Sequence, residues 1–239
     1  MEQVFLSDID LFYSSKISEE QSKVFLDDEE FNHAVKVLRK NVSDEIFITD
    51  GIGKIYQCEI RFIEKKNLTA ELIKKYSYKK RFSNLTFCLP LLKNKERQEF
   101  ALEKSIELGI TNFIYYSSDK SFKSKPNLER INKIALAAMK QSLQAFKPNI
   151  SFVKSIHDLK NDNSEIIYFD QKGEDYLESY LNTYSNDKDY VLIIGSESGF
   201  SDNEMNYLRD KTSLKISNNR LRSETAVIYA AVIINSTIK

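Results

Sequence analysis

The chain has 239 residues, of which 41% are hydrophobic and 29% charged, and its 35 basic and 35 acidic side chains give a formal net charge of zero. This length allows one large or two small domains, and the composition excludes a disordered chain. The longest apolar run, residues 226–234, is far shorter than the roughly 20 residues of a membrane span, and no signal-peptide pattern opens the chain. We therefore expect a cytoplasmic globular protein.

The cysteines and histidines exclude two kinds of site. Cys58 and Cys88 stand far apart, no CxxC pair occurs, and the chain has only two histidines. A Cys/His zinc site and a disulfide scaffold are therefore excluded, and we expect no bound metal.

The charge is distributed unevenly along the chain. Residues 81–160 carry 14 basic and 7 acidic side chains, whereas the segments on either side are net acidic. A basic middle in a neutral protein favours a local surface for a polyanion, although a solvated lysine-rich surface would give the same pattern.

The N-terminal third predicts a small β-rich domain. Residues 28–39 predict a helix, because their acidic start and basic end suit the helix dipole. Asp50-Gly51 and Gly53 mark a hairpin turn, since glycine readily takes positive φ angles. Several short strands with one helix favour a small barrel over residues 1–75, followed by a basic linker at residues 76–81. The expected strands are residues 22–26, 45–49, 55–63 and 68–73.

From residue 82 onward, strands and helices alternate, which predicts an α/β domain with a parallel sheet over residues 82–239. Gly109 stands where a helix C-cap is expected, and Ser201 with Glu204 forms a capping box that opens a helix. The last helix is apolar on almost every side, so we expect it to be buried on several sides. The expected strands are residues 85–92, 112–116, 166–169, 190–194 and 213–216, and the expected helices are residues 96–108, 128–144, 175–184 and 224–237 and one that begins after Ser201.

One loop at the end of a predicted strand favours a ligand site. Ligands of open α/β sheets bind in loops beyond the carboxyl ends of the strands. Residues 194–201 (IGSESGFS) form such a loop, in which Gly195 and Gly199 would let the backbone approach a ligand, although a simple turn into a helix would also explain them. Neither GxGxxG nor GxxxxGK[ST] occurs in the chain, which weakens an NAD or ATP interpretation.

A second loop, residues 218–226, joins the last strand to the last helix. Ser223 or Thr225 is expected to cap this helix, and Glu224 lies in its first turn, where a carboxylate is favourable. Capping leaves Arg220 and Arg222 unexplained, because two cations before a helix start repel the dipole unless negative charge lies nearby. The loop therefore predicts a site for an anion or for developing negative charge.

Together the two loops resemble the cofactor-binding motifs of the bacterial 16S ribosomal RNA uracil-N3 methyltransferases, a family of the SPOUT superfamily. GSESGFS at residues 195–201 resembles the family's GPEGGFS-like loop, and ISNNRLRSETA at residues 216–226 resembles LGxxxLRTETA. Similar stretches run in order from about residue 11 to the end, which makes the set specific. They are HAxxVLR from His33, DGxGxxY from Asp50, KxxxRxE from Lys93, KxxELG from Lys104, and Glu129-Arg130 with AxxQS from Ala138 and with Pro148.

The chain departs from the family pattern at four positions. Ser196, Ser198 and Ser217 stand where the family usually has Pro, Gly and Gly, and Lys120 stands where it usually has Arg. A serine held at positive φ would strain its loop by about a kcal/mol or more, and its side chain could crowd a cofactor. The low content of glycine (6) and proline (3) offers a neutral explanation, a mutational bias of an AT-rich genome.

The resemblance implies an N-terminal PUA-like barrel that helps to hold RNA. It also implies a C-terminal SPOUT domain whose last helix threads a loop as a trefoil knot and forms a homodimer interface. S-adenosylmethionine is the implied cofactor. The residues expected to bind it are Ile194, Gly195, Ser196, Glu197, Ser198, Gly199, Ile216, Ser217, Asn219, Leu221 and Thr225.

The resemblance also implies roles in the reaction. Arg222 would stabilise negative charge on a uracil carbonyl as N3 loses its proton, or grip a phosphate. Glu224 is a candidate base or orienting group, unless it is only a favourable carboxylate at a helix start. The expected RNA contacts are His33, Arg39, Lys93, Lys95, Arg97, Lys120, Lys123 and Lys125.

The expected function is methylation of N3 of a uridine in 16S ribosomal RNA of the small subunit. Two alternatives stay open from the sequence: a degenerate or non-catalytic RNA-binding or ribosome-assembly factor of the same fold, and a SPOUT methyltransferase that acts on another RNA.

Overall fold

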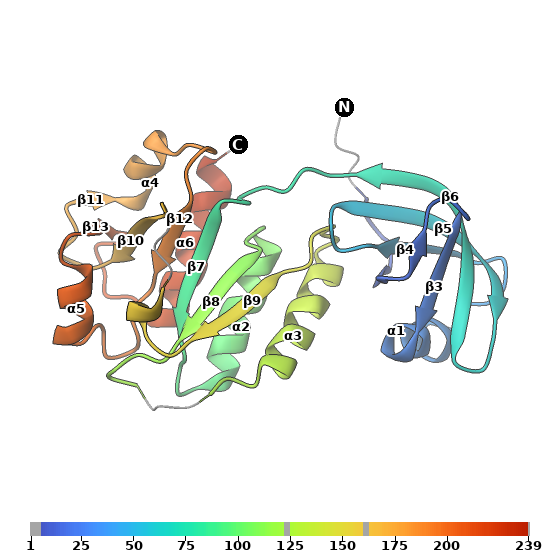
Figure 1. The fold of residues 1–239 in the computed structure, drawn as a ribbon, viewed down its shortest axis with the longest axis horizontal. Helices are drawn as coiled ribbons and strands as arrows, with labels where there is room; N and C mark the ends of the chain where they lie inside the picture. Colours follow the sequence, from blue (N-terminus) through green and yellow to red (C-terminus); the bar gives the residue numbers. More distant parts are fainter. Residues whose placement is uncertain (1–5, 122–124, 160–162, 239) are drawn as a thin grey trace. The chain divides into compact units, whose positions relative to one another are not determined.

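The computed structural model describes residues 6–121, 125–159 and 163–238 (Figure 1). The chain forms two compact units, one of residues 1–80 with 139–147 and the other of residues 81–138 with 148–239. No described helix is long and apolar enough to cross a membrane.

The N-terminal unit is built on a six-stranded sheet in the order β1-β4-β5-β6-β3-β2. All neighbouring pairs are antiparallel except β1 and β4, which are parallel. The strands are β1 (Leu11–Tyr13), β2 (Ile17–Ser18), β3 (Lys23–Asp27), β4 (Glu45–Thr49), β5 (Lys54–Ile63) and β6 (Asn67–Ser77). The two short strands β1 and β2 lie outside every predicted strand, and β6 runs further into the basic stretch than predicted.

The ends of this sheet meet, so that it closes into a barrel. β1 and β2 are its two edges, yet only three residues separate them in the chain. One of these residues, Ser14, bonds to both sides: its N–H donates to Thr49 O on β4 at 3.0 Å, and its Oγ donates to Phe25 O on β3 at 2.6 Å. The predicted small barrel is thus confirmed.

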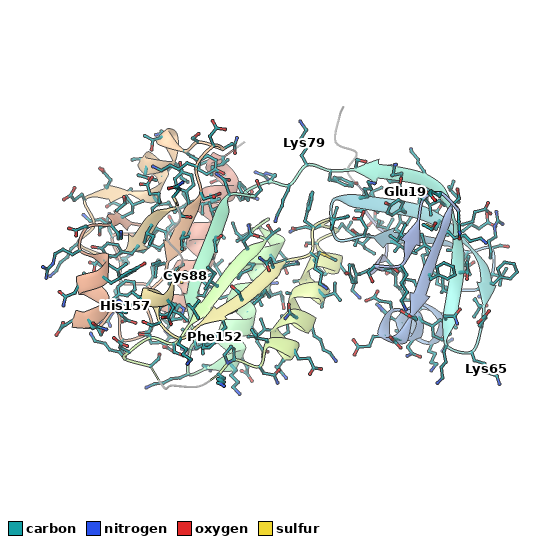
Figure 2. The ribbon with its side chains drawn as sticks, in the orientation of Figure 1. Glu19, Lys65, Lys79, Cys88, Phe152 and His157 are labelled. Atoms are coloured by element: carbon teal, nitrogen blue, oxygen red, sulfur yellow. The ribbon has the colours of Figure 1, made fainter. Side chains whose placement is uncertain are left out.

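A carboxylate ties three strand residues of this unit together on its surface. Glu19, labelled in Figure 2, accepts hydrogen bonds from Lys54 Nζ at 2.6 Å, Lys75 Nζ at 2.9 Å and Tyr56 Oη at 2.8 Å. The ammonium group of Lys54, followed by that of Lys75, lowers the pKa of Glu19 to about 2.

The predicted helix at residues 28–39 is divided into two. α1 (Asp28–Asn32) runs into a π-helical turn (His33–Val37), in which Leu38 N–H donates to His33 O. Two residues after the turn, Arg39 takes φ +55°, and Lys40 N–H donates to Ala34 O. A residue at positive φ followed by such a wide hydrogen bond is a common helix terminus.

The segment 139–147 packs with the N-terminal unit at the predicted Asp50-Gly51 turn. Gly53 N–H donates to Ala145 O at 3.0 Å, and Lys147 N–H donates to Gly51 O at 2.8 Å. Gly51 and Gly53 both have positive φ, and a Cβ on Gly53 would lie 2.8 Å from the ring of Phe146. Glycine is required at this turn for its conformation and for its close approach to the segment.

The C-terminal unit contains a seven-stranded sheet in the order β11-β13-β10-β12-β7-β8-β9. Every neighbouring pair is parallel, as predicted from the alternation of strands and helices. The strands are β7 (Leu85–Pro90), β8 (Asn112–Tyr116), β9 (Asn149–Val153), β10 (Glu165–Phe169), β11 (Asp175–Tyr176), β12 (Tyr190–Ile193) and β13 (Thr212–Lys215).

Helices cover both faces of this sheet (Figure 1). Cys88, labelled in Figure 2, and Ile193 form one core cluster with Leu208 of α5. Since side chains alternate along a strand, Phe87 and Leu192 point to the opposite face, behind which α2 and α6 pack against each other. The helices are α2 (Lys95–Glu107), α3 (Leu128–Gln141), α4 (Leu177–Tyr180), α5 (Asp202–Leu208) and α6 (Ser223–Thr237).

The fold class is confirmed, with one local correction. Residues 175–184 are not one helix but β11, the short helix α4 and a 3₁₀ turn (Leu181–Thr183), because Asp175 and Tyr176 pair with β13. β13 lies near one edge of the sheet. From its end the chain runs past the end of β12 to α6, and α6 packs on α2.

Candidate functional site

The two candidate loops follow β12 and β13, whose carboxyl ends lie at the same edge because the sheet is parallel. β10 separates the two strands, yet the loops are in direct contact. The Oγ of Ser223, the first residue of α6, donates to Gly195 O at 2.7 Å, and Ser223 is 5% exposed. This part-buried hydrogen bond joins the start of α6 to the first loop.

The first loop is a tight turn closed by its own backbone and one hydroxyl group. Gly199 N–H donates to Ser196 O at 2.9 Å, and Ser196 Oγ donates to Gly199 O at 2.8 Å. Gly199 has φ +69°, and no atom outside residues 198–200 lies within 4 Å of the position that a Cβ would take. The turn therefore needs glycine at residue 199 and presents that residue to open space.

The concern that serine strains these loops is not borne out by the backbone. Ser196, Ser198 and Ser217 are all described, and none has a positive φ. The Ser196 hydroxyl closes the turn, and the Ser217 hydroxyl accepts from Asn219 N–H at 3.1 Å. Two of the three substituted serines thus support their loops by local hydrogen bonds.

Buried side chains from β8 and α5 support the first loop from below. Tyr116 Oη donates to Ile194 O at 2.8 Å, and burial raises the pKa of Tyr116 well above its usual value, so that it stays a donor. Ser118 Oγ donates to Ser196 Oγ at 3.3 Å. Glu204, which is 1% exposed, accepts from the N–H groups of Asp119 and Ser201, and Ser201 caps α5 as predicted.

The start of α6 differs from the prediction. Its N-cap is Arg222, and no side chain caps the helix, so the expected capping by Ser223 or Thr225 is wrong. Ser223 bonds to the first loop instead, and Thr225 is exposed. Arg220 and Arg222 are exposed, and neither has a hydrogen-bond or ion-pair partner among the described residues. The helix start therefore keeps uncapped amide groups beside two unpaired cations.

The two carboxylate oxygens of Glu224 have different surroundings. Its Oε1 lies 3.5 Å from Arg97 Nε, and its side chain is 12% exposed. Its Oε2 is buried and has no hydrogen-bond partner in the part of the chain that the structure describes. A buried oxygen without a donor is costly, so this atom is suited to accept a proton or a hydrogen bond from a bound molecule.

The remaining predicted cofactor residues lie on the same two loops. Ile194 is buried, and Ile216 and Leu221 are half-buried, whereas Asn219 is exposed. Glu197 Oε1 accepts from Lys93 N–H at 3.1 Å, which joins the first loop to the connection after β7.

The predicted phosphate contacts of the C-terminal unit lie on the connections that follow β7 and β8 and on the first turn of α2. The described members are all exposed, and they are Lys93, Lys95, Arg97, Lys120 and Lys125. Lys123 lies outside the described residues.

His33 and Arg39 belong to the N-terminal unit, at the two ends of the π-helical turn. Both are exposed, and the His33 ring lies 5.7 Å from the ring of Phe12. They are surface groups of the barrel.

Sequence reasoning missed three supporting residues, Tyr116, Ser118 and Glu204. Tyr116 and Ser118 come at the end of β8, whose carboxyl end lies at the same edge as the two loops. The rule that selected the two loops would have found them as well. Glu204 was identified only as part of a capping box, because its contact with residue 119 is not local.

Comparison with known proteins places this site in a family. Residues 79–235 match the model of the RNA methyltransferase domain, and residues 26–73 match the RNA methyltransferase PUA domain. The ribosomal RNA small subunit methyltransferase E of Mesomycoplasma hyopneumoniae is 30% identical, over 91% of this chain and 96% of that protein. The chain belongs to this RNA methyltransferase family.

Two solved structures resemble the fold of this chain over almost its whole length. A probable rRNA methyltransferase from Porphyromonas gingivalis is 27% identical with a TM-score of 0.81, over 96% of this chain and 98% of that one. The ribosomal RNA small subunit methyltransferase E of Neisseria gonorrhoeae, solved bound to S-adenosyl methionine, has a TM-score of 0.79 at 21% identity. It covers 95% of this chain and 97% of its own. At that identity, the second likeness bears on the fold alone.

Proposed function

We propose that this chain transfers a methyl group from S-adenosylmethionine to N3 of a uridine in 16S ribosomal RNA of the small subunit. The observation that carries the proposal is the pair of strand-end loops joined by the Ser223–Gly195 hydrogen bond, in a chain of the RNA methyltransferase family. The names of the relatives, which are ribosomal RNA small subunit methyltransferases, support the substrate.

The two loops fit the proposed cofactor. Gly199 faces open space, which leaves room for a ligand against the backbone of the first loop. Ile194, Ile216 and Leu221 would make apolar contacts with the adenine ring. The loop backbone and the side chains of Asn219 and Thr225 would make polar contacts with the cofactor. The remaining proposed contacts are Gly195, Ser196, Glu197, Ser198 and Ser217. The bound cofactor would supply an electrophilic methyl group, and the protein would orient it.

The acceptor nitrogen must lose its proton before or during transfer. N3 of uracil lies between two carbonyl groups, so its deprotonation places negative charge on their oxygens. The unpaired guanidinium of Arg222, at the uncapped start of α6, is suited to stabilise that charge. Glu224 Oε2 is the proposed proton acceptor or orienting group, with Arg97 holding the other carboxylate oxygen.

RNA would be held by both units. The exposed lysines after β7 and β8 would contact phosphates, and the PUA-like barrel would contribute His33 and Arg39. We retain residues 1–75 and 82–239 as the proposed functional domains, with a basic linker at residues 76–81. Uracil N3 is used in base pairing, so the target base must be unpaired or flipped out of its helix.

A homodimer is the proposed assembly. Apolar side chains remain exposed on the packed pair α2 and α6: Phe100 is 51% exposed, Tyr229 44% and Val232 41%. A second copy covering this face would bury it, as is usual in obligate dimers. The proposed location is the cytoplasm, where ribosomal subunits are assembled.

Mapping of modified nucleotides tests the function. Ribosomal RNA from cells that lack the gene should lose one N3-methyluridine from 16S RNA, and the wild-type gene, but not an Arg222→Ala variant, should restore it. An unchanged modification pattern in the deletion strain would favour the alternative of a non-catalytic assembly factor. Loss of a methyl group from another RNA would favour the alternative substrate.

A further inference from the structure

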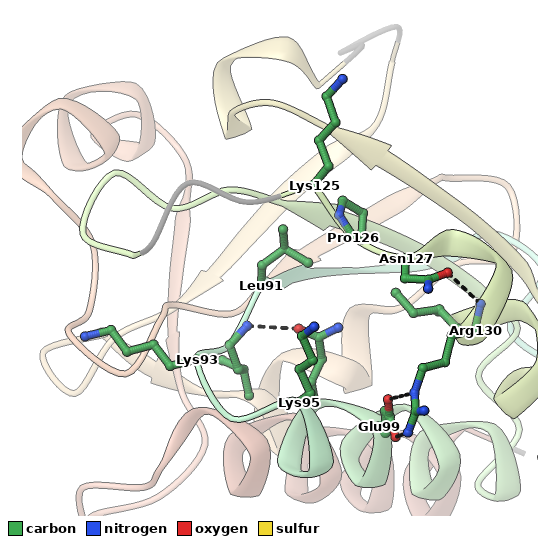
Figure 3. A pocket seen from close by; sticks show the side chains of 11 residues that line it. Leu91, Lys93, Lys95, Glu99, Lys125, Pro126, Asn127 and Arg130 are labelled. Carbon is green, nitrogen blue, oxygen red and sulfur yellow. Dashed lines mark hydrogen bonds and ion pairs between the residues drawn. The ribbon is translucent and has the colours of Figure 1, made fainter.

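A cavity lies between the starts of α2 and α3, close to the loop site (Figure 3). Its volume is about 470 Å³, within the range of roughly 300–1,000 Å³ that is usual for small-molecule sites. Leu91, Pro126 and Ile131 give it an apolar lining, and the cations Lys93, Lys95 and Lys125 and the ion pair of Arg130 with Glu99 also line it. An apolar hollow lined as well by lysines suits a flat, uncharged ring attached to an anion.

Arg130 forms a fixed flat wall of this cavity. Its guanidinium group makes two parallel hydrogen bonds to the Glu99 carboxylate, one of them from Nη2 to Oε2 at 2.9 Å. The Arg130 hydrogen bond lowers the pKa of Glu99, which keeps the pair ionised. Asn127 Oδ1 accepts from Arg130 N–H at 3.0 Å, so the backbone of this residue is fixed as well.

Pairing with Glu99 changes what Arg130 can do. The carboxylate already compensates the guanidinium charge and occupies one edge of the group, which makes Arg130 a poor clamp for phosphate. Its side chain is nevertheless 63% exposed, so the plane of the group stays accessible. Guanidinium planes are surfaces on which unpaired bases stack.

The polar groups of the cavity match a nucleotide. Gln98 is 9% exposed, and its Oε1 accepts from Leu92 N–H at 3.0 Å. Its Nε2 has no acceptor among the described residues and can donate to the edge of a base. Lys93 and Lys125 extend outward from two different sides of the mouth, where the phosphates before and after a bound base would pass (Figure 3). Neither lysine has an ion-pair partner in the part of the chain described.

This cavity is distinct from the proposed site of methyl transfer. The first turn of α2 lies between them, because Arg97 on this turn reaches Glu224, whereas Gln98 and Glu99 line the cavity. A base bound here is therefore not the one that receives the methyl group.

We propose that this cavity binds an unpaired nucleotide next to the target uridine, stacking its base on the Arg130 guanidinium plane and donating to its edge from Gln98. The inference rests on the proposed function for the identity of the RNA. The cavity would hold the strand in register, so that the neighbouring uridine reaches the loop site.

Two variants of Arg130 separate stacking from phosphate binding. The probes are fluorescein-labelled hexauridylate and an abasic RNA of the same length, titrated against the full-length protein. Wild-type protein should bind hexauridylate roughly 5- to 100-fold more tightly than the abasic strand, a range typical of stacking on one base. Arg130→Ala and Arg130→Lys should both lose most of this preference, and Arg130→Lys, which keeps a cation beside Glu99, should bind the abasic strand as before. Arg209→Lys and Arg209→Ala are matched controls on the exposed end of α5 and should change neither affinity.

Either of two results would overturn the proposal: equal binding of both probes by the wild type, or full rescue by Arg130→Lys, since lysine keeps the charge but lacks the plane. Methylation of small subunits is a separate readout. If the base preference depends on Arg130 but the protein methylates no ribosomal RNA, the assignment of the cavity is supported and the proposed function is contradicted. If the protein methylates ribosomal RNA normally but shows no base preference, the proposed function is supported and the assignment of the cavity is contradicted.

Discussion

Replacement of Gly199 by alanine tests the cofactor site most selectively, because two effects of the change can be separated. The backbone at Gly199 has φ +69°, so any side chain there costs about 1–2 kcal/mol of strain. Apart from residues 198–200 themselves, no protein atom lies within 4 Å of the new Cβ, so the methyl group meets no clash with the rest of the protein. It would instead occupy space that we assign to the cofactor.

Gly109→Ala is the matched control. Gly109 also has a positive φ, +95°, and its Cβ would lie 3.2 Å from the ring of Phe82. It follows the far end of α2, whose last residue lies about 15 Å along the helix from Arg97. Both variants should thus lose about 1–2 kcal/mol in the free energy of unfolding measured with urea.

Only the Gly199→Ala variant should bind S-adenosylmethionine more weakly, by about tenfold or more in calorimetry, which corresponds to roughly 1.4 kcal/mol. Equal cofactor affinity in Gly199→Ala and the wild type would refute the placement of the cofactor against the first loop. An equal loss of affinity in both glycine variants would show that strain, and not contact with the ligand, is responsible.

Three further predictions address the reaction, the RNA and the assembly. Arg222→Ala should keep its cofactor affinity and lose roughly two to three orders of magnitude in single-turnover rate at saturating RNA, whereas a loss confined to subsaturating RNA would make Arg222 a phosphate contact. Combined Lys93→Ala and Lys95→Ala should lower the slope of log affinity against log salt concentration by about 0.7–0.9 per lost contact, and an unchanged slope would remove both from the RNA surface. Val232→Asp, on the exposed face of α6, should shift the protein from dimer to monomer in sedimentation, and a monomeric wild type would contradict the proposed assembly.

The sequence predicted those parts of the fold that depend on local signals. The capping box of Ser201 and Glu204 and the glycine after α2 lie where expected, because each depends on hydrogen bonds within a few residues. The edge strand β9 (Asn149–Val153) was missed, because no residue of this strand is fully buried and its apolar pattern is therefore weak. β1 and β2 have three and two residues, too few for a period to be visible.

The two loops of the site could be predicted from the sequence, but the contacts between them could not. Ser223 has the residue type and position of a helix cap, yet its hydroxyl bonds to Gly195, 28 residues earlier, a contact that no local pattern contains. The supposed strain at Ser196 was wrong for a similar reason, since the positive φ of the turn falls on Gly199 alone. The cavity beside Arg130 joins residues of α2 and α3 and of the connections that precede them, which only the tertiary fold brings together.

The most direct test of the proposed activity uses purified components. Small ribosomal subunits from cells that lack this modification are incubated with the protein and with S-adenosylmethionine that carries an isotopically labelled methyl group. The 16S RNA is then digested and its nucleosides are analysed by mass spectrometry. We predict close to one labelled N3-methyluridine per 16S RNA, and none with the Arg222→Ala variant at short times. Absence of label from the ribosomal RNA, or label at an atom other than N3 of uracil, would contradict the account.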